Sequence, residues 1–206
     1  MKISWNYPKP RKGLAGAFDR FVGPGATKME IFLQILFVTI AAIALPVYAV
    51  VNKLGWNMAQ LVIGSIIALD MTGGVITNAT SSAKRYWHRE GVGFGFHIKF
   101  ILIHAVQLFV VAYFFRSMDW SFFAISYIYL IIGALIILKS PLYLQRPVAM
   151  MMYLGGLVVN FYVLSPSPRG MEWFLPVFFL KLFICHLLRE EPYRPDDEEI
   201  GKTEEG

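Results

Sequence analysis

The sequence predicts an all-α, polytopic membrane protein with six transmembrane helices. Apolar residues make up 56% of its 206 residues and charged residues only 16%, whereas soluble domains carry about 25% charged residues. The apolar residues form long runs rather than the periodic stripes of soluble amphipathic helices. Most Lys and Arg residues lie between these runs, where such residues set the orientation of helices in a membrane.

Six apolar runs are long enough to cross a bilayer, which takes about 20 residues with roughly 17–25 tolerated. We expect the spans at residues 30–51, 57–79, 97–115, 119–138, 147–164 and 172–188. Pro141 and Pro147 mark the break between the fourth and fifth spans, because proline is tolerated at a helix start but not in its interior. The last two runs are the shortest.

The flanking segments differ in charge. Residues 1–29 form a basic N-terminal segment, and residues 189–206 form an acidic, proline-containing tail. Within the first segment, Leu14 to Val22 has the pattern of a short amphipathic helix lying on the membrane surface. Its proline and glycine content is equally compatible with an irregular tail. The 30–188 region between the two segments forms the transmembrane domain.

The distribution of positive charge predicts the orientation of the chain. With the N-terminus inside, 14 of the 19 Lys and Arg residues lie on the inner side and three, Lys53, Arg116 and Arg169, on the outer side. Cytoplasmic loops carry the excess of Lys and Arg in membrane proteins. We therefore expect both termini in the cytoplasm and a multi-pass location in the plasma membrane.

The net charge of +5 indicates lipid rather than nucleic acid as the partner. The cations lie beside apolar runs, where they meet anionic head groups at the cytoplasmic face of the bilayer. A basic stripe of the kind that binds nucleic acid does not stand alone in the sequence. The single cysteine, Cys185, excludes an intramolecular disulfide. The sequence does not indicate an oligomeric state.

A polar site is predicted around Asp70, in the second span. A carboxylate inside a membrane costs about 2.5–3.5 kcal/mol on insertion scales, so such a residue faces the bundle interior and has a partner. Asp70, Gly74, Thr77, Asn78 and Ser81 recur at helical spacing. They therefore form one small and polar face that runs from the middle of the membrane to the cytoplasmic end.

His97 and His104 extend the candidate site to the third span. They are seven residues apart, so they share a face of that helix. The second and third spans are antiparallel neighbours, and counting residues from the cytoplasmic side places Asp70 and His104 within about 5 Å in depth. We therefore predict a hydrogen-bonded Asp70–His104 pair, which either takes part in chemistry or only joins two helices.

The last apolar run and the loop after the second span also contain ionisable side chains. Lys181, in the last apolar run, either extends towards the interface or neutralises Asp70. His186, five residues later, is expected to point in another direction on an α-helix. His88, in the loop after the second span, is expected to belong to the polar surface.

The loop between the second and third spans is a candidate contact for anionic head groups. It contains Lys84, Arg85 and Arg89, followed by three glycines before a helix start. Backbone N–H groups, the helix dipole and several cations suit a phosphate there. The spacing of a Walker phosphate loop is missing.

Three functions are compatible with these features: a small transporter or proton relay, a membrane-embedded enzyme acting on a lipid or other amphiphile, and a non-catalytic scaffold. His and Asp are metal ligands and general bases, but HExxH and histidine-box motifs are missing. The sequence therefore specifies no catalytic residue, metal or cofactor. An enzyme predicts that Asp70, His97 and His104 meet in one cavity, whereas a transporter predicts a polar path to the outer face.

Overall fold

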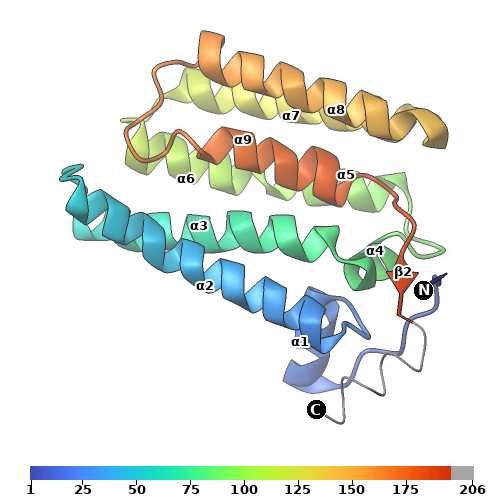
Figure 1. Ribbon diagram of the computed structural model, residues 1–206. Coiled ribbons are helices and arrows are strands. Elements are labelled where there is room, and N and C mark those ends of the chain that lie inside the picture. The colour runs from blue at the N-terminus through green and yellow to red at the C-terminus, as the bar shows by residue number, and fades with distance from the viewer. Residues whose placement is uncertain (196–206) are drawn as a thin grey trace.

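A computed structural model of the chain describes residues 1–195 and is almost entirely helical (Figure 1). Residues 196–206 of the predicted acidic tail lie outside the described residues. The all-α class is confirmed, with one pair of very short strands added. The elements are β1 (Lys2–Ile3), α1 (Gly13–Val22), α2 (Lys28–Val51), α3 (Met58–Ala79), α4 (Ser81–Trp87), α5 (Phe94–Ile103), α6 (Ala105–Phe115), α7 (Trp120–Lys139), α8 (Leu142–Val158), η1 (Val159–Val163), α9 (Phe174–Phe179), η2 (Leu180–His186) and β2 (Tyr193–Arg194).

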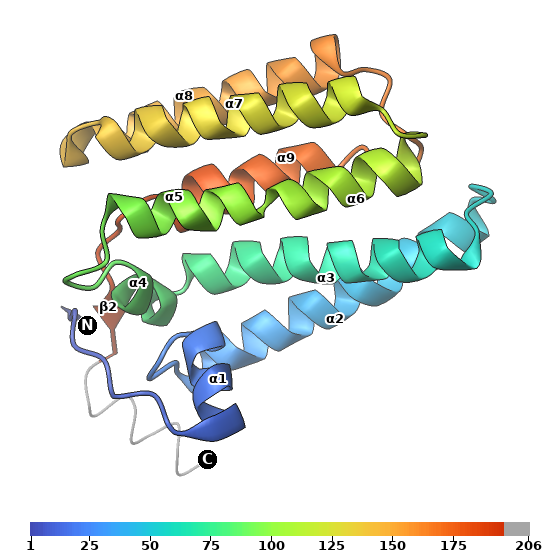
Figure 2. The ribbon, with the colours of Figure 1, turned by 180° about the vertical axis from the view of Figure 1, so that it is seen from behind.

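The long helices run alternately in opposite directions and form three layers (Figures 1 and 2). Helices α2 and α3 pack together on one side, α7 and α8 on the other, and α5–α6 and α9–η2 lie between them. The end of the bundle that holds α1, α4 and the β1–β2 pair is called the α4 end below. The opposite end, called the far end, holds the connections over 52–57, 116–119 and 164–173.

Among residues 1–195, five helices are long and apolar enough to cross a membrane. They are Lys28–Val51, Met58–Ala79, Phe94–Phe115, Trp120–Lys139 and Leu142–Val163. The sixth predicted span corresponds to a shorter apolar helix, Phe174–His186, so the count of six crossings stays a prediction. The fifth helix begins at Leu142 rather than at residue 147, because Pro141 precedes the helix and Pro147 lies inside it. A proline this close to a helix start removes only one intrahelical bond.

Local sequence signals explain where the first two long helices begin. Thr27 and Glu30 form a reciprocal capping box at α2, and Asn57 and Gln60 form one at α3. In each box the side chains satisfy backbone N–H groups that have no partner within the helix. Glu30 Oε1 also accepts from the Ser82 backbone N–H at 3.1 Å. The start of α2 is thereby joined to the start of α4.

The centre of the bundle is the α9–η2 helix. Most of its aromatic and aliphatic side chains are buried, and only the side with Val177, Leu180 and Ile184 is partly exposed. Such burial is typical of a helix that is largely surrounded by protein. Glycines in two neighbouring helices admit its rings: a Cβ on Gly133 would lie 2.5 Å from Phe183 Cζ, and one on Gly156 would lie 2.6 Å from Phe179 Cδ2. The α9–η2 side chains below 3% exposure are Phe174, Leu175, Phe178, Phe179, Leu182, Phe183 and His186.

Helix α1 lies across the α4 end, beside the start of α2 (Figure 1). This segment is therefore helical rather than irregular. Leu14, Phe18 and Phe21 occupy one side of the helix and are all exposed. On the other side Asp19 is bound by Arg11, with Oδ1 2.7 Å from the guanidinium, and this hydrogen bond lowers the pKa of Asp19 to about 2. The helix thus has the apolar and polar faces of an interfacial helix.

Candidate functional site

Asp70 and Lys181 form an ion pair near the middle of the bundle. Lys181 Nζ, from η2, lies 3.0 Å from Asp70 Oδ1, from α3. Gln107 Nε2, from α6, donates to Asp70 Oδ2 at 3.1 Å. The two charged side chains differ in exposure: the Lys181 side chain is 3% exposed and the Asp70 side chain is 41% exposed. The carboxylate is therefore the accessible member of the pair.

Gly74 permits this pairing. It lies one turn after Asp70 on α3, so the two residues share a face. A Cβ built on Gly74 would lie 2.2 Å from Lys181 Cε and 2.7 Å from Lys181 Cδ. The lysine side chain therefore passes directly over the glycine to reach the carboxylate, and any larger residue at position 74 would displace it.

The structure differs from the predicted Asp70–His104 pair. His104 Nδ1 donates to the Phe100 backbone carbonyl at 2.7 Å, on its own helix, while Asp70 is bound by Lys181 and Gln107. Asp70 and His104 line the same cavity without binding each other. Of the two alternatives for Lys181, the structure has the one in which it neutralises Asp70, from a helix more than 100 residues later.

The cavity beside the ion pair has a volume of about 480 Å³. Polar side chains gather around Asp70 and along the α3 face, including Thr77, Asn78, His104 and Gln107. The remaining walls are mainly apolar and come from α1, α2, α3, α4 and α5. The apolar lining residues are Phe18, Phe21, Val22, Ile35, Val38, Leu69, Trp87, Phe100 and Ile103. The site therefore combines a group of polar side chains with mainly apolar walls.

His97 belongs to a second polar cluster, nearer the α4 end. His97 Nδ1 lies 3.3 Å from His186 Nε2, and His186 Nδ1 lies 3.2 Å from Asn78 Oδ1. Asn78 Nδ2 donates to the Gly74 carbonyl at 2.7 Å, so its Oδ1 is the acceptor. His186 Nδ1 therefore donates to Asn78, and in a neutral ring its Nε2 accepts from His97. These bonds join α3, α5 and η2.

The predicted shared face of His97 and His104 is interrupted. The Phe100 ring stacks on His186 with ring centroids 3.8 Å apart, and it meets the His104 ring at an interplanar angle of 50° with centroids 4.6 Å apart. It thus lies in contact with one histidine of each cluster. Helix α5 also ends at Ile103, where the His104 N–H bonds to Ile101 three residues back. This tighter turn changes the rotation that an uninterrupted α-helix would give.

Sequence reasoning missed His186 and His88, for different reasons. Residues 180–186 form a π-helix, whose bonds join residues five apart. Lys181 and His186 are five apart, so they lie on nearly the same side, whereas an α-helix would separate them. His88 is buried rather than on the loop surface: its ring stacks on His97 at 4.7 Å, and its Nε2 donates to the His186 carbonyl at 2.9 Å. Burial lowers the pKa of His88 to about 3.

Two of the three cations predicted to contact head groups are buried. Lys84 Nζ donates to the Cys185 and Leu188 carbonyls at 2.7 Å each. Arg85 donates to the Gly25 carbonyl at 3.3 Å, and its side chain is 1% exposed. Burial lowers the pKa of both groups. Their helix α4 turns inward against the segments at both ends of the described chain, so these cations satisfy carbonyl groups.

Arg89 is the cation of that loop that borders a surface depression. The depression lies at the α4 end, has a volume of about 700 Å³ and is also lined by Arg189 and Trp5. The Arg189 guanidinium lies 4.7 Å from the Trp5 ring centroid, and the Arg89 guanidinium lies 4.3 Å from the Tyr86 ring centroid. Arg89 therefore stays a candidate contact for an anionic head group.

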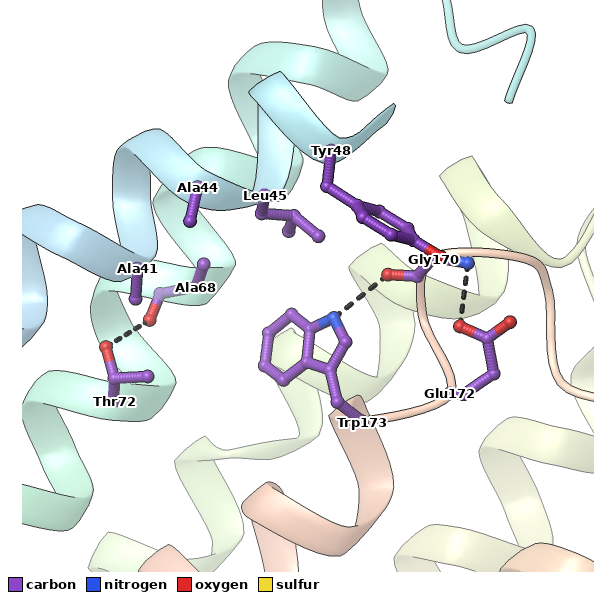
Figure 3. Close-up of a pocket in the computed structure, with 9 residues that line it drawn as sticks. All are labelled: Ala41, Ala44, Leu45, Tyr48, Ala68, Thr72, Gly170, Glu172 and Trp173. Atoms are coloured by element: carbon purple, nitrogen blue, oxygen red, sulfur yellow. Dashed lines mark hydrogen bonds between the residues drawn. The ribbon is translucent and has the colours of Figure 1, made fainter. Parts of the chain in front are cut away.

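A different cavity of about 420 Å³ lies towards the far end, between α2, α3 and the loop before α9 (Figure 3). Its walls are mostly apolar, and its polar groups bind one another locally. Trp173 Nε1 donates to the Gly170 carbonyl at 2.9 Å, and the Gly170 N–H donates to Glu172 at 2.7 Å (Figure 3). Thr72 donates to the Ala68 carbonyl at 2.6 Å. These three donors are occupied, which leaves the Tyr48 hydroxyl and the Glu172 carboxylate as the polar side-chain groups of the lining, without an ion pair of the kind found at Asp70.

Within residues 1–195, His, Cys, Asp and Glu side chains do not form a group of three or more placed to hold a metal ion. Comparison with protein-family models, with curated proteins and with solved structures finds no match to this chain. The site is therefore interpreted from its own geometry.

Proposed function

We propose that this chain is an integral membrane protein whose Asp70 cavity binds an amphiphile from the bilayer. The observation that carries the proposal is the composition of the cavity: an ion pair, a histidine and several uncharged polar side chains, against walls that are mainly aromatic and aliphatic. Ligand sites commonly combine apolar walls with a few placed polar groups. A volume of about 480 Å³ suits a polar group with part of an attached chain.

In the proposed arrangement the chain crosses the plasma membrane six times. Residues 1–29 and the tail from residue 189 lie on the cytoplasmic side. Five long apolar helices and the Phe174–His186 helix support it. The excess of positive charge at the α4 end supports the orientation. Counting from Ala79, Asp70 then lies about 14 Å along α3 from the cytoplasmic end.

Transport across the membrane, or proton relay, is less well supported. Between the ion pair and the far end, apolar side chains fill most of the centre of the bundle. Leu108, Val111, Phe122, Leu175 and Phe178 are all at most 2% exposed there. A continuous polar path, which transport of an ion requires, would have to pass through this packed region. In a non-catalytic scaffold the ion pair would only join the helices, and the cavity beside it would have no ligand.

Acid–base chemistry on the bound amphiphile is the second candidate. His104 Nδ1 is occupied by the Phe100 carbonyl, so in the neutral ring Nε2 is the nitrogen that can accept a proton. His104 and Asp70 both line the cavity. A bound polar group would lie beside a potential general base and a carboxylate.

Trp87, which lines the cavity, provides a direct test of binding. We would retain Trp87, change the other four of the five tryptophans to Phe, and reconstitute the protein in lipid nanodiscs. Fatty alcohols brominated at different carbons would be added, because bromine quenches tryptophan fluorescence on contact. We expect saturable quenching that unbrominated alcohol reverses by competition.

The matched controls separate binding from quenching by bulk lipid. A variant that retains only Trp120, which is 52% exposed at the far end, should show gradual quenching without saturation. Ile103→Phe narrows the cavity and should weaken the saturable phase, whereas Val106→Phe, on the same helical segment and outside the lining, should not. Identical unsaturable quenching of Trp87 and Trp120 would overturn the proposal.

A further inference from the structure

The cavity contains one negative and one positive side chain, and they neutralise each other. Of its lining residues only Asp70 and Lys181 carry formal charges at neutral pH, and their charged atoms are 3.0 Å apart. A ligand with its own charge would enter a mainly apolar site that offers no unpaired countercharge. Moving an unpaired charge out of water is expensive. The charge balance therefore favours an uncharged polar group.

The accessible part of the ion pair is an acceptor. The Asp70 side chain is 41% exposed, whereas the Lys181 side chain is 3% exposed. An ionised carboxylate has about four acceptor positions, and the bonds from Lys181 and Gln107 occupy two of them. The ammonium is covered by protein, so a ligand at this end meets oxygen atoms that can only accept hydrogen bonds.

Neighbouring groups add to this excess of acceptors. Gln107 Nε2 is committed to Asp70, and Gln107 Oε1 is a buried oxygen without a hydrogen-bond partner among the described residues. His104 Nδ1 is committed to Phe100, which leaves Nε2 of the neutral ring as an acceptor. The groups beside Asp70 thus direct their donors at protein atoms, and the His104 ring, which lines the cavity, adds an acceptor for a ligand that donates.

From this balance we infer that the ligand of the Asp70 cavity is an uncharged amphiphile with a hydroxyl group that donates to the Asp70 carboxylate. The inference rests on the proposed function, because it names the ligand class of the same cavity. Long-chain alcohols and lipids with a neutral hydroxylated head belong to this class. Methyl ethers lack the donor, fatty acids add a negative charge beside Asp70, and fatty amines add a positive charge beside Lys181.

Competition at Trp87 distinguishes these classes. An alcohol, its methyl ether, the amine and the acid, all of one chain length, would compete with the brominated alcohol in the Trp87-only protein. A hydrogen bond to a charged acceptor is worth roughly tenfold or more in affinity. We expect the alcohol to bind about tenfold more tightly than its ether, and the amine and acid to bind more weakly than the alcohol.

The variant Asp70→Leu/Lys181→Met removes both charges together and leaves neither partner unpaired. In it the alcohol and the ether should bind equally, while the ether keeps its original affinity, which also shows that the cavity has folded. Equal binding of alcohol and ether in the unaltered pair, or preference for the amine or acid, would overturn the inference and leave amphiphile binding intact. Absence of any saturable binding would overturn both proposals.

Discussion

The side chain of Lys181 lies directly over the Cα of Gly74, where a Cβ would come within 2.2 Å of Lys181 Cε. This contact is what lets a lysine from the last helix reach a carboxylate on the second long helix. The ion pair therefore requires a residue without a Cβ at position 74.

Gly74→Ala should separate Lys181 from Asp70 and lower the melting temperature of the protein in detergent. The added methyl group occupies the path of the lysine side chain, so the variant loses the pair although alanine favours a helix by about 1 kcal/mol over glycine. Gly95→Ala is the matched control, because a Cβ there meets nothing within 4 Å. An equal or higher melting temperature for Gly74→Ala than for Gly95→Ala would contradict the close approach.

Removing one member of the ion pair should cost more than removing both. Lys181→Met leaves a carboxylate that is partly exposed, whereas Asp70→Asn leaves a buried ammonium without its countercharge. Asp70→Asn should therefore lower the free energy of unfolding more than Lys181→Met does, with a loss of up to about 3 kcal/mol. This figure is the lower end of the range for a buried ion pair that loses one partner. Thermal unfolding of both single variants and the double variant measures this. Additive losses in the double variant would show that the pair is not coupled.

The folded protein should lose stability in mild acid through His88. Its pKa falls from 6.5 to about 3 on burial among Lys84, His97 and Arg189, so between these values the unfolded chain binds a proton that the folded chain does not. Stability therefore decreases as the pH falls through this window and is fully present above it. His88→Gln keeps a donor for the His186 carbonyl and should show a smaller drop in melting temperature between about pH 7 and about pH 4.5. If His88→Gln and the unaltered protein lose the same stability over this pH range, His88 is already charged in the folded state.

Cysteine labelling tests the orientation and the sixth crossing. In a Cys185→Ala background, a membrane-impermeant maleimide added to intact cells should modify Lys53→Cys and Arg169→Cys. It should modify Glu90→Cys and Arg194→Cys only after the membrane is opened. The short Phe174–His186 helix can cross because protein rather than lipid surrounds most of it, so its length need not match the bilayer. Labelling of residues 169 and 194 from the same side of the membrane would mean that the Phe174–His186 segment does not cross it.

The long apolar runs made the helices predictable, whereas the side chains that bind one another across the helices were harder to predict. The runs over 30–51, 57–79 and 119–138 agree with α2, α3 and α7 to within a few residues, because chain length and hydropathy alone decide a lipid-exposed helix. Asp70 and Lys181 were identifiable because a charge in an apolar run is costly wherever it lies. Gln107 was not, since an uncharged amide gives no such signal.

The histidine cluster depended on features that a sequence pattern does not carry. The π-helical bonding of η2 brings His186 to the side of Lys181, and nothing in the apolar run distinguishes it from an α-helix. Lys84 and Arg85 have the sequence pattern of an anion-binding loop. Their partners are the carbonyl groups of Cys185, Leu188 and Gly25, together with the Glu190 carboxylate, which lies 3.4 Å from Lys84 Nζ. Backbone acceptors exist in every sequence, so only the tertiary arrangement selects them.

The central position of the last helix has a consequence for the synthesis of the protein. The α9–η2 core leaves the ribosome after all the long helices that surround it, so those helices are made before their common packing partner exists. Gly133 and Gly156 receive the Phe183 and Phe179 rings only once this last helix is in place. A truncation before residue 174 would therefore leave the surrounding helices without the side chains that fill the space between them.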